Sequence, residues 1–242
     1  MRIMILENLN MLRGRDIAIC DGLTIRQPTL GDIEELGEDE YFSMLTAFTC
    51  TPFDLIAQLD EMGIDFTQVT SYQLFVVMYK FINTKASKCL FGDFDFSKLI
   101  RVDNDGKLEL MYKDIVINEA VFNKIADCIR KLHMIPPPQY TKVANEYTKQ
   151  KMIESAYSDL EFAKRKKKKS FIKLYVSRAT NHPYFKYRLD EVWNLKVYAF
   201  FDAIKSISIV ESSKNLSMGA YSGNLDLSKI NKQEFNWLRE TD

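Results

Sequence analysis

The order of turn and helix signals between Asp16 and Gly63 constrains the fold of this chain most strongly. Two short runs of alternating apolar residues are joined by Asp21-Gly22, a pair typical of two-residue turns. Pro28 ends this predicted hairpin, because proline has no N–H to donate to a continuing ladder. Helical spacing follows from Gly31. The stretch therefore predicts a hairpin followed by helices, and it contains no recognisable catalytic motif.

Two further helices carry clear boundary signals. Thr51 can cap the first, with Pro52 at the first helical position and Gly63 as a left-handed stop. Thr70 and Gln73 have capping-box spacing ahead of the second. The apolar residues expected on the buried faces are Leu55, Leu59 and Met62 in the first helix, and Leu74, Phe75, Met78, Phe81 and Ile82 in the second.

A second small β element is predicted over Leu99 to Ile117. Two apolar runs flank Asn104-Asp105-Gly106, another hairpin signal, and Ile115 to Ile117 can add a third strand. A sheet of this size needs a helix across one face to be stable. Asn118 can cap that helix, which the prolines at 136–138 would end. Its expected buried stripe is Phe122, Ile125, Ile129 and Leu132.

The remainder of the chain is more charged and also helical in pattern. The fold class predicted is therefore predominantly helical α+β, with an N-terminal hairpin and a central hairpin or three-stranded sheet. We expect an N-terminal α+β domain at residues 1–138 and a helical C-terminal region at 139–242, with a single domain as the alternative. The C-terminal helices expected are Val143 to Lys169, with an apolar seam of Tyr147, Ile153, Tyr157 and Leu160; Phe171 to Arg178; Leu189 to Val210; and one after Asn231, whose Glu234 completes a capping-box spacing.

Charge and cysteine content limit the function classes. The 33 basic and 33 acidic side chains cancel, so that no whole-protein field attracts nucleic acid or an anionic membrane. The four cysteines lie roughly thirty residues apart, without the close pairs of a metal knuckle or redox motif, and we interpret them as separate thiols. The N-terminus lacks the apolar core of a signal peptide, and no stretch approaches a membrane span. A reducing cytoplasm is expected.

The strongest local anomaly is a run of six cations that could bind phosphates or an acidic partner: Lys164, Arg165, Lys166, Lys167, Lys168 and Lys169. The alternative is a solvated helix end, because the helix dipole favours cations there. The aromatic residues that follow could stack on bases or could equally belong to a core; they are Phe171, Tyr175, Tyr184, Phe185 and Tyr187. Charge reversal at Lys167 and Lys168 would test a contact with an acidic partner.

No pattern supports metal or catalytic chemistry. Asp103 to Gly106 is similar to part of a calcium loop, but aligning its glycine puts Arg101 and Tyr112 at required ligand positions. Asp93 and Asp95 lie on one side of an extended segment without further ligands of clear spacing. His133 and His182 are too few for a histidine-rich zinc site. We expect no enzyme activity, cofactor or metal, although a triad scattered through the fold is not excluded by sequence order.

Several segments together resemble a family of poorly characterised proteins of bacteriophages and prophages of Gram-positive bacteria, encoded among virion morphogenesis genes. The likeness extends over nearly the whole chain. None of the segments is catalytic, so the resemblance implies a context and no active-site residues. The segments are Leu23 to Ile33, Ala144 to Lys149, Trp193 to Ala203 and Gly219 to Gly223.

This resemblance implies a tail assembly role, as a chaperone or adaptor that binds tail or tape-measure subunits in the host cytoplasm. Phe75 to Tyr79 and Tyr198 to Phe201 carry more apolar surface than one helix face needs, which suits a binding protein and suits an ordinary core equally well. The alternatives are a structural virion component near the baseplate or connector, and a nucleic-acid-binding protein that uses the basic run. The expected partners are tail or other virion proteins and no membrane.

Overall fold

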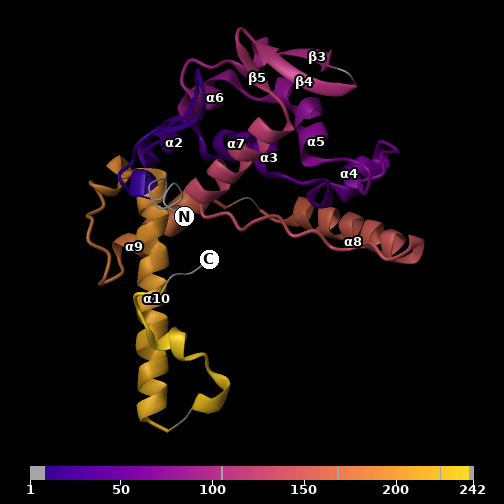
Figure 1. Ribbon diagram of the computed structural model, residues 1–242. Coiled ribbons are helices and arrows are strands. Elements are labelled where there is room, and N and C mark those ends of the chain that lie inside the picture. Colours follow the sequence, from indigo (N-terminus) through magenta and orange to yellow (C-terminus); the bar gives the residue numbers. More distant parts are fainter. Residues whose placement is uncertain (1–8, 105, 168, 224, 240–242) are drawn as a thin grey trace.

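The computed structural model describes residues 9–104, 106–167, 169–223 and 225–239. Within these residues the chain is predominantly helical, with one two-stranded and one three-stranded antiparallel sheet. This confirms the predicted fold class. Figure 1 shows a body that contains both sheets and most helices, and a long helix, α10, that extends away from it.

The predicted N-terminal hairpin is confirmed. It pairs β1 (Ile17–Cys20) with β2 (Leu23–Ile25), and Ile17 lies opposite Ile25. Gly22 in its turn has φ of 82°, a conformation that L side chains rarely adopt. The buried side chains of β2 anchor the hairpin to the core.

Two helices follow the hairpin. Thr29 and Asp32 form a capping box at the start of α2 (Leu30–Leu36), and the chain then turns at Gly37 into α3 (Glu38–Thr49). Helix α3 was not among the elements predicted from the sequence. Its N-cap residue, Gly37, makes no side-chain cap bond, so the local boundary signal was absent. The helix is nevertheless central, and its buried residues are Tyr41, Met44, Leu45, Ala47 and Phe48.

The helix predicted to begin at Thr51 is interrupted. Thr51 and Asp54 form the capping box, but they start a single 3-10 turn, η1 (Pro52–Asp54). Leu55 then has φ of −124° and ψ of 28°, outside helical geometry, and α4 spans only Ile56–Glu61. Because the helix ends before Met62, that side chain leaves the buried face and is 62% exposed. The prediction of a buried Met62 was wrong.

The helix predicted after Thr70 is confirmed as α5 (Ser71–Met78), with its Thr70–Gln73 capping box. The chain tightens into a 3-10 turn at η2 (Tyr79–Phe81), and α6 (Thr84–Phe91) follows. A 3-10 turn rotates successive residues further than an α-helix does. Phe81 consequently points away from the core and is 86% exposed, so its predicted burial was wrong.

The central β element is a three-stranded sheet that follows η3 (Phe96–Lys98). Its strands are β3 (Ile100–Asn104), β4 (Lys107–Tyr112) and β5 (Ile115–Ile117), in that spatial order. Asp105 of the predicted turn lies outside the described residues. Asn118 caps α7 (Glu119–Leu132), and all four residues of the predicted stripe on α7 are buried. The helix ends before the prolines.

The C-terminal elements differ from prediction mainly in their boundaries. The helix predicted over Leu189 to Val210 is a short turn followed by a long helix displaced toward the C-terminus. The last predicted helix is a single 3-10 turn. The observed elements are α8 (Glu146–Arg165), α9 (Phe171–Thr180), η4 (Val192–Asn194), α10 (Val197–Tyr221), η5 (Leu227–Lys229) and η6 (Lys232–Phe235).

Two apolar clusters hold these elements together. The larger one joins the hairpin, α3, α5, α6 and α7 with α9 and the start of α10. The smaller one lies between α4 and α8, where Met152, Ile153 and Ala156 of α8 pack on it. Tyr147, predicted in this seam, is 72% exposed and was wrongly placed. The division into residues 1–138 and 139–242 stays a prediction.

Candidate protein-binding site

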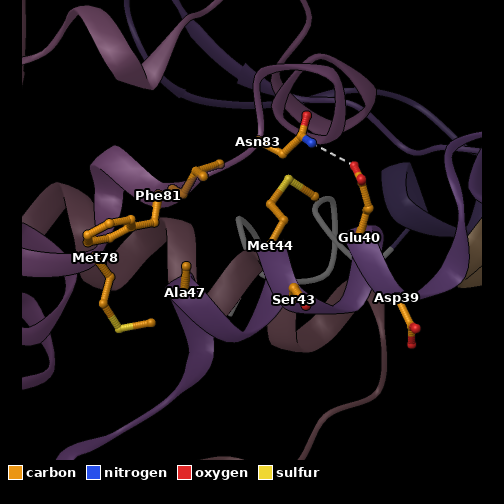
Figure 2. Close-up of a pocket in the computed structure, with 9 residues that line it drawn as sticks. Asp39, Glu40, Ser43, Met44, Ala47, Met78, Phe81 and Asn83 are labelled. Carbon is orange, nitrogen blue, oxygen red and sulfur yellow. Dashed lines mark hydrogen bonds between the residues drawn. The ribbon is translucent and has the colours of Figure 1, made fainter. Parts of the chain in front are cut away.

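A pocket of about 430 Å³ lies between α3 and the segment that joins α5 to α6. We call it the α3–η2 pocket. Figure 2 shows residues of both sides, which are separated by more than thirty positions in the sequence. The lining residues are Asp39, Glu40, Ser43, Met44, Ala47, Met78, Phe81, Ile82 and Asn83.

The floor of the α3–η2 pocket is apolar. Met44 and Ala47 lie one turn apart on α3, and both are almost completely buried. Ile82 faces them from the segment after η2, where it is also buried. Methionine is unbranched and polarisable, so that a methionine-lined surface can adapt to side chains of different shape. Such a floor suits an apolar protein segment.

Phe81 is the most exposed of the large apolar residues that line the pocket. Its ring lies near Met78 at one end of the pocket in Figure 2. With 86% of its surface exposed, the ring contributes little to the core of the chain. Covering a phenylalanine side chain is worth roughly 1.5–3 kcal/mol. An aromatic residue beside a partly formed apolar pocket is typical of a protein-binding surface.

The opposite end of the pocket is acidic. The Glu40 carboxylate accepts a hydrogen bond from Asn83 Nδ2 at 2.7 Å, shown as a dashed line in Figure 2. Asn83 is itself fixed, because its Oδ1 accepts from the Lys85 N–H and caps α6. A second pocket of about 490 Å³ shares Glu40, Ile82 and Asn83 and adds Glu35. The apolar surface therefore continues into a polar region that contains the carboxylates of Glu35 and Glu40 and the ammonium group of Lys85.

Glu38, in the same first turn of α3, forms hydrogen bonds with the start of α9. Glu38 accepts hydrogen bonds from the Ser170 hydroxyl at 2.6 Å and from the Phe171 and Ile172 N–H groups. Those N–H groups begin α9 and lack helical partners of their own. Glu38 thus acts within the fold, whereas Glu40 lies at the pocket.

The predicted basic run begins in the last turn of α8 and continues toward α9. Lys164 and Arg165 occupy the last turn of α8, where the helix dipole favours cations. Arg165 pairs with Glu161 at 3.3 Å, and Lys166 Nζ lies 4.4 Å from the Phe162 ring centroid. Lys167 and Lys169 are exposed, and Lys168 lies outside the described residues. None of the described residues of the run lines the α3–η2 pocket.

Most of the aromatic residues that follow the run are used within the fold. Phe171 and Tyr175 pack against each other and against Phe201 of α10. Phe185 packs on Phe200. These contacts favour the core interpretation over base stacking for three of the five predicted aromatics.

The acidic pairs and histidines form no metal site in the described parts of the chain, where no group of three possible metal ligands occurs. Asp95 instead caps η3 by accepting from the Ser97 N–H, and the hydrogen bonds from Ser97 lower the pKa of Asp95. His182 Nδ1 lies 3.3 Å from the Tyr184 N–H. No helix among the described residues is long and apolar enough to cross a membrane.

Comparison with known protein families matches the C-terminal third of the chain. Residues 164–242 match the family described as the YomV second domain. That segment begins in the basic run and includes α9 and α10. This family is associated with phages, which supports a bacteriophage origin for the chain. No curated protein and no solved structure matches the chain.

Of the pocket residues, the sequence indicated only Met78, within Phe75 to Tyr79, as part of either a binding surface or an ordinary core. Phe81 was predicted to be a core residue, and α3 was not predicted. A signal for α3 does exist, because Tyr41, Met44, Leu45 and Phe48 recur at three- and four-residue spacing. The approach of α3 to η2 depends on the tertiary fold and leaves no sequence motif.

Proposed function

We propose that the protein is a non-enzymatic bacteriophage tail morphogenesis factor, a chaperone or adaptor that binds tail or tape-measure subunits during virion assembly in the host cytoplasm. The observation that carries this proposal is the α3–η2 pocket, with an exposed aromatic residue at its apolar end and a carboxylate at its other end. The phage-associated family match supports the context.

The chemistry of the pocket defines the partner. Met44, Met78 and Phe81 would cover apolar side chains of an incoming segment. Glu40 would pair with a lysine or arginine placed at the end of that segment, because its second oxygen keeps acceptor capacity beside Asn83. Subunits that polymerise into a tail must cover such segments before assembly, since exposed apolar surfaces associate nonspecifically.

The nearest rival is a structural virion component at the baseplate or connector. The two roles differ in whether the protein stays in the particle. We expect the tagged chain to co-purify with a tail protein from phage-producing cells and to be missing from purified virions, as measured by mass spectrometry. A fixed copy number in finished particles would instead establish the structural role.

A further inference from the structure

The three-stranded sheet has an exposed edge at β3, the outer strand of the hairpin that β3 forms with β4. Four of the five residues of β3 are exposed, and Ile100 is 63% exposed. Figure 1 shows the sheet at one end of the body, away from α8 and α10. An edge strand presents unpaired N–H and C=O groups with which another strand can pair. The edge of β3 is therefore a candidate interaction surface.

The register of the hairpin identifies which backbone groups of β3 face outward. Asn104 and Lys107 are separated by two residues and lie directly opposite each other. They therefore form a hydrogen-bonded pair, and such pairs alternate along an antiparallel ladder. It follows that the N–H and C=O groups of Arg101 and Asp103 point away from β4. Among the described residues, the structure shows no hydrogen-bond partner for any of these four groups.

The two faces of β3 differ in chemistry. Arg101 lies on the face toward α5, because its guanidinium group donates to the Val76 carbonyl at 2.6 Å and its strand partner is the buried Leu110. Successive side chains of a strand point to opposite faces, so Ile100 and Val102 lie on the outer face. The edge thus combines outward backbone groups with charged side chains on one face and apolar side chains on the other.

The edge of β3 is complementary to itself in an antiparallel arrangement. A two-fold axis at Val102 places Arg101 of each copy opposite Asp103 of the other. Both residues present outward N–H and C=O groups, so each of the two pairs can form two backbone hydrogen bonds. The Val102 residues of the two copies then face each other at the axis as a non-hydrogen-bonded pair, in which side chains lie closest.

The charges of the edge select this register. Because only Arg101 and Asp103 present outward groups, the alternatives place the axis at one of these two residues. Each alternative brings like charges directly opposite, which is unfavourable, whereas the axis at Val102 brings two opposite-charge pairs together. The bond from Arg101 to Val76 leaves other guanidinium N–H groups for a carboxylate. Asp103 Oδ1 accepts from the Gly106 N–H at 2.8 Å, which leaves Oδ2 for an arginine.

We propose that β3 pairs with β3 of a second copy of this chain, in an antiparallel two-fold dimer whose two three-stranded sheets join into one sheet of six strands. Backbone hydrogen bonds between Arg101 and Asp103 hold the two strands together, and the side chains of the same residues set the register. A contact made by a five-residue strand of each copy lies at the weak end of specific interfaces. This pairing does not depend on the proposed role in tail assembly.

Sedimentation analysis of the full chain over a concentration series tests the pairing. We expect a monomer–dimer equilibrium that Asp103→Lys weakens at least about tenfold, because it places cations opposite one another in both pairs. Asp127→Lys makes the same charge change at an exposed position of α7 and should leave the dimer unchanged. Mixing Asp103→Lys with Arg101→Glu restores opposite charges in both pairs, so the mixture should dimerise more strongly than either variant alone.

Cysteine substitution tests the register separately. Val102→Cys places two sulfur atoms opposite each other at the axis, within the reach of a disulfide, whereas Asn104→Cys places them about 14 Å apart along the strands. Under mild oxidation, we expect Val102→Cys to form covalent dimers at least about tenfold faster than Asn104→Cys or the wild type. Non-reducing gel electrophoresis measures these rates, and the wild type accounts for the four native cysteines.

Circular dichroism verifies that each variant is folded. The test does not rest on Arg101→Glu, which also loses the bond to Val76, because Asp103→Lys and the cross-linking decide without it. A wild-type chain that stays monomeric up to about 500 μM overturns the proposal. So does a dimer that Asp103→Lys weakens no more than Asp127→Lys does. Equal cross-linking rates of Val102→Cys and Asn104→Cys overturn the register.

Discussion

His133 shows how a single buried side chain can make the stability of this protein depend on pH. Its Nδ1 lies 2.7 Å from the Ile129 carbonyl oxygen, and its Nε2 lies 2.6 Å from the Tyr41 hydroxyl. A carbonyl oxygen only accepts, so Nδ1 carries the proton and Nε2 accepts from Tyr41. Both nitrogens of the neutral ring are thereby satisfied. Burial lowers the pKa of His133 to about 4 from an ordinary value of 6.5.

We therefore expect the free energy of unfolding to fall as pH decreases. Above pH 6.5, His133 is neutral in both states and its contribution is fully present. Between pH 6.5 and about 4, His133 is protonated in the unfolded chain but stays neutral in the folded chain. The contribution of His133 to the free energy of unfolding is therefore lost progressively as the pH falls. The loss attributable to this group reaches about 3 kcal/mol. Urea unfolding of the wild type and His133→Gln across this range measures it.

Other carboxylates also titrate in this range, so the informative quantity is the difference in slope between the two proteins. His182→Gln, which removes the other histidine, should keep the wild-type slope. An unchanged slope in His133→Gln would show that the buried histidine is not the origin of the pH dependence.

Arg130 on α7 donates a hydrogen bond to the C-terminal end of α3. It lies on α7, is 8% exposed, and donates to the Thr49 carbonyl at the C-terminus of α3. The last turn of α3 contains no basic residue, so Arg130 supplies both the donor and the positive charge that a helix C-terminus favours. The side chain therefore connects the two central helices of the body.

Replacing Arg130 with methionine should destabilise the protein by about 1–3 kcal/mol, because it leaves the half-buried Thr49 carbonyl without this donor. The adjacent exposed Lys131→Met provides the control and should cost less than about 0.5 kcal/mol. Urea unfolding at neutral pH measures both changes. Equal effects of the two substitutions would contradict the role given to Arg130.

The elements that the sequence predicted well are those whose boundaries rest on local bonds. The Thr70–Gln73 capping box, the Asn118 cap and the Gly22 turn each involve residues within a few positions of one another. The pattern on α7 was equally clear. A structural biologist could therefore have drawn these parts from the sequence alone.

The errors have a common physical origin in tertiary packing. α3 lacks a side-chain cap, and packing against distant helices stabilises it instead. The exposure of Met62 and Phe81 follows from helix ends that their own spacing does not reveal. The α3–η2 pocket is formed by two segments that come into contact only in the folded state. Local sequence patterns do not predict this tertiary contact.

At the scale of the whole molecule, the α3–η2 pocket and the basic run are in different places. The α3–η2 pocket belongs to the body, whereas α10 extends away from it (Figure 1). The basic run begins in the last turn of α8, and none of its described residues lines the pocket. The pocket and the described residues of the basic run therefore lie on different segments of the chain.

Neutralising the charges of the basic run distinguishes the proposed adaptor function from nucleic-acid binding. We expect the combined change of Lys166, Lys167 and Lys169 to glutamine to leave capture of the tail partner unchanged, because these residues do not line the pocket. Binding to single-stranded nucleic acid is measured alongside, at increasing salt. Affinity that falls steeply with salt and disappears in this variant would favour the nucleic-acid alternative.

The most direct test of the central claim is quantitative capture of the tail partner by matched variants. Phe81→Ser changes an exposed side chain and should alter stability by less than about 0.5 kcal/mol, yet reduce capture at least about tenfold. Tyr147→Ser removes a similarly exposed aromatic residue on α8 and should capture as much partner as the wild type. Equal capture by Phe81→Ser and the wild type would contradict a partner site in the α3–η2 pocket.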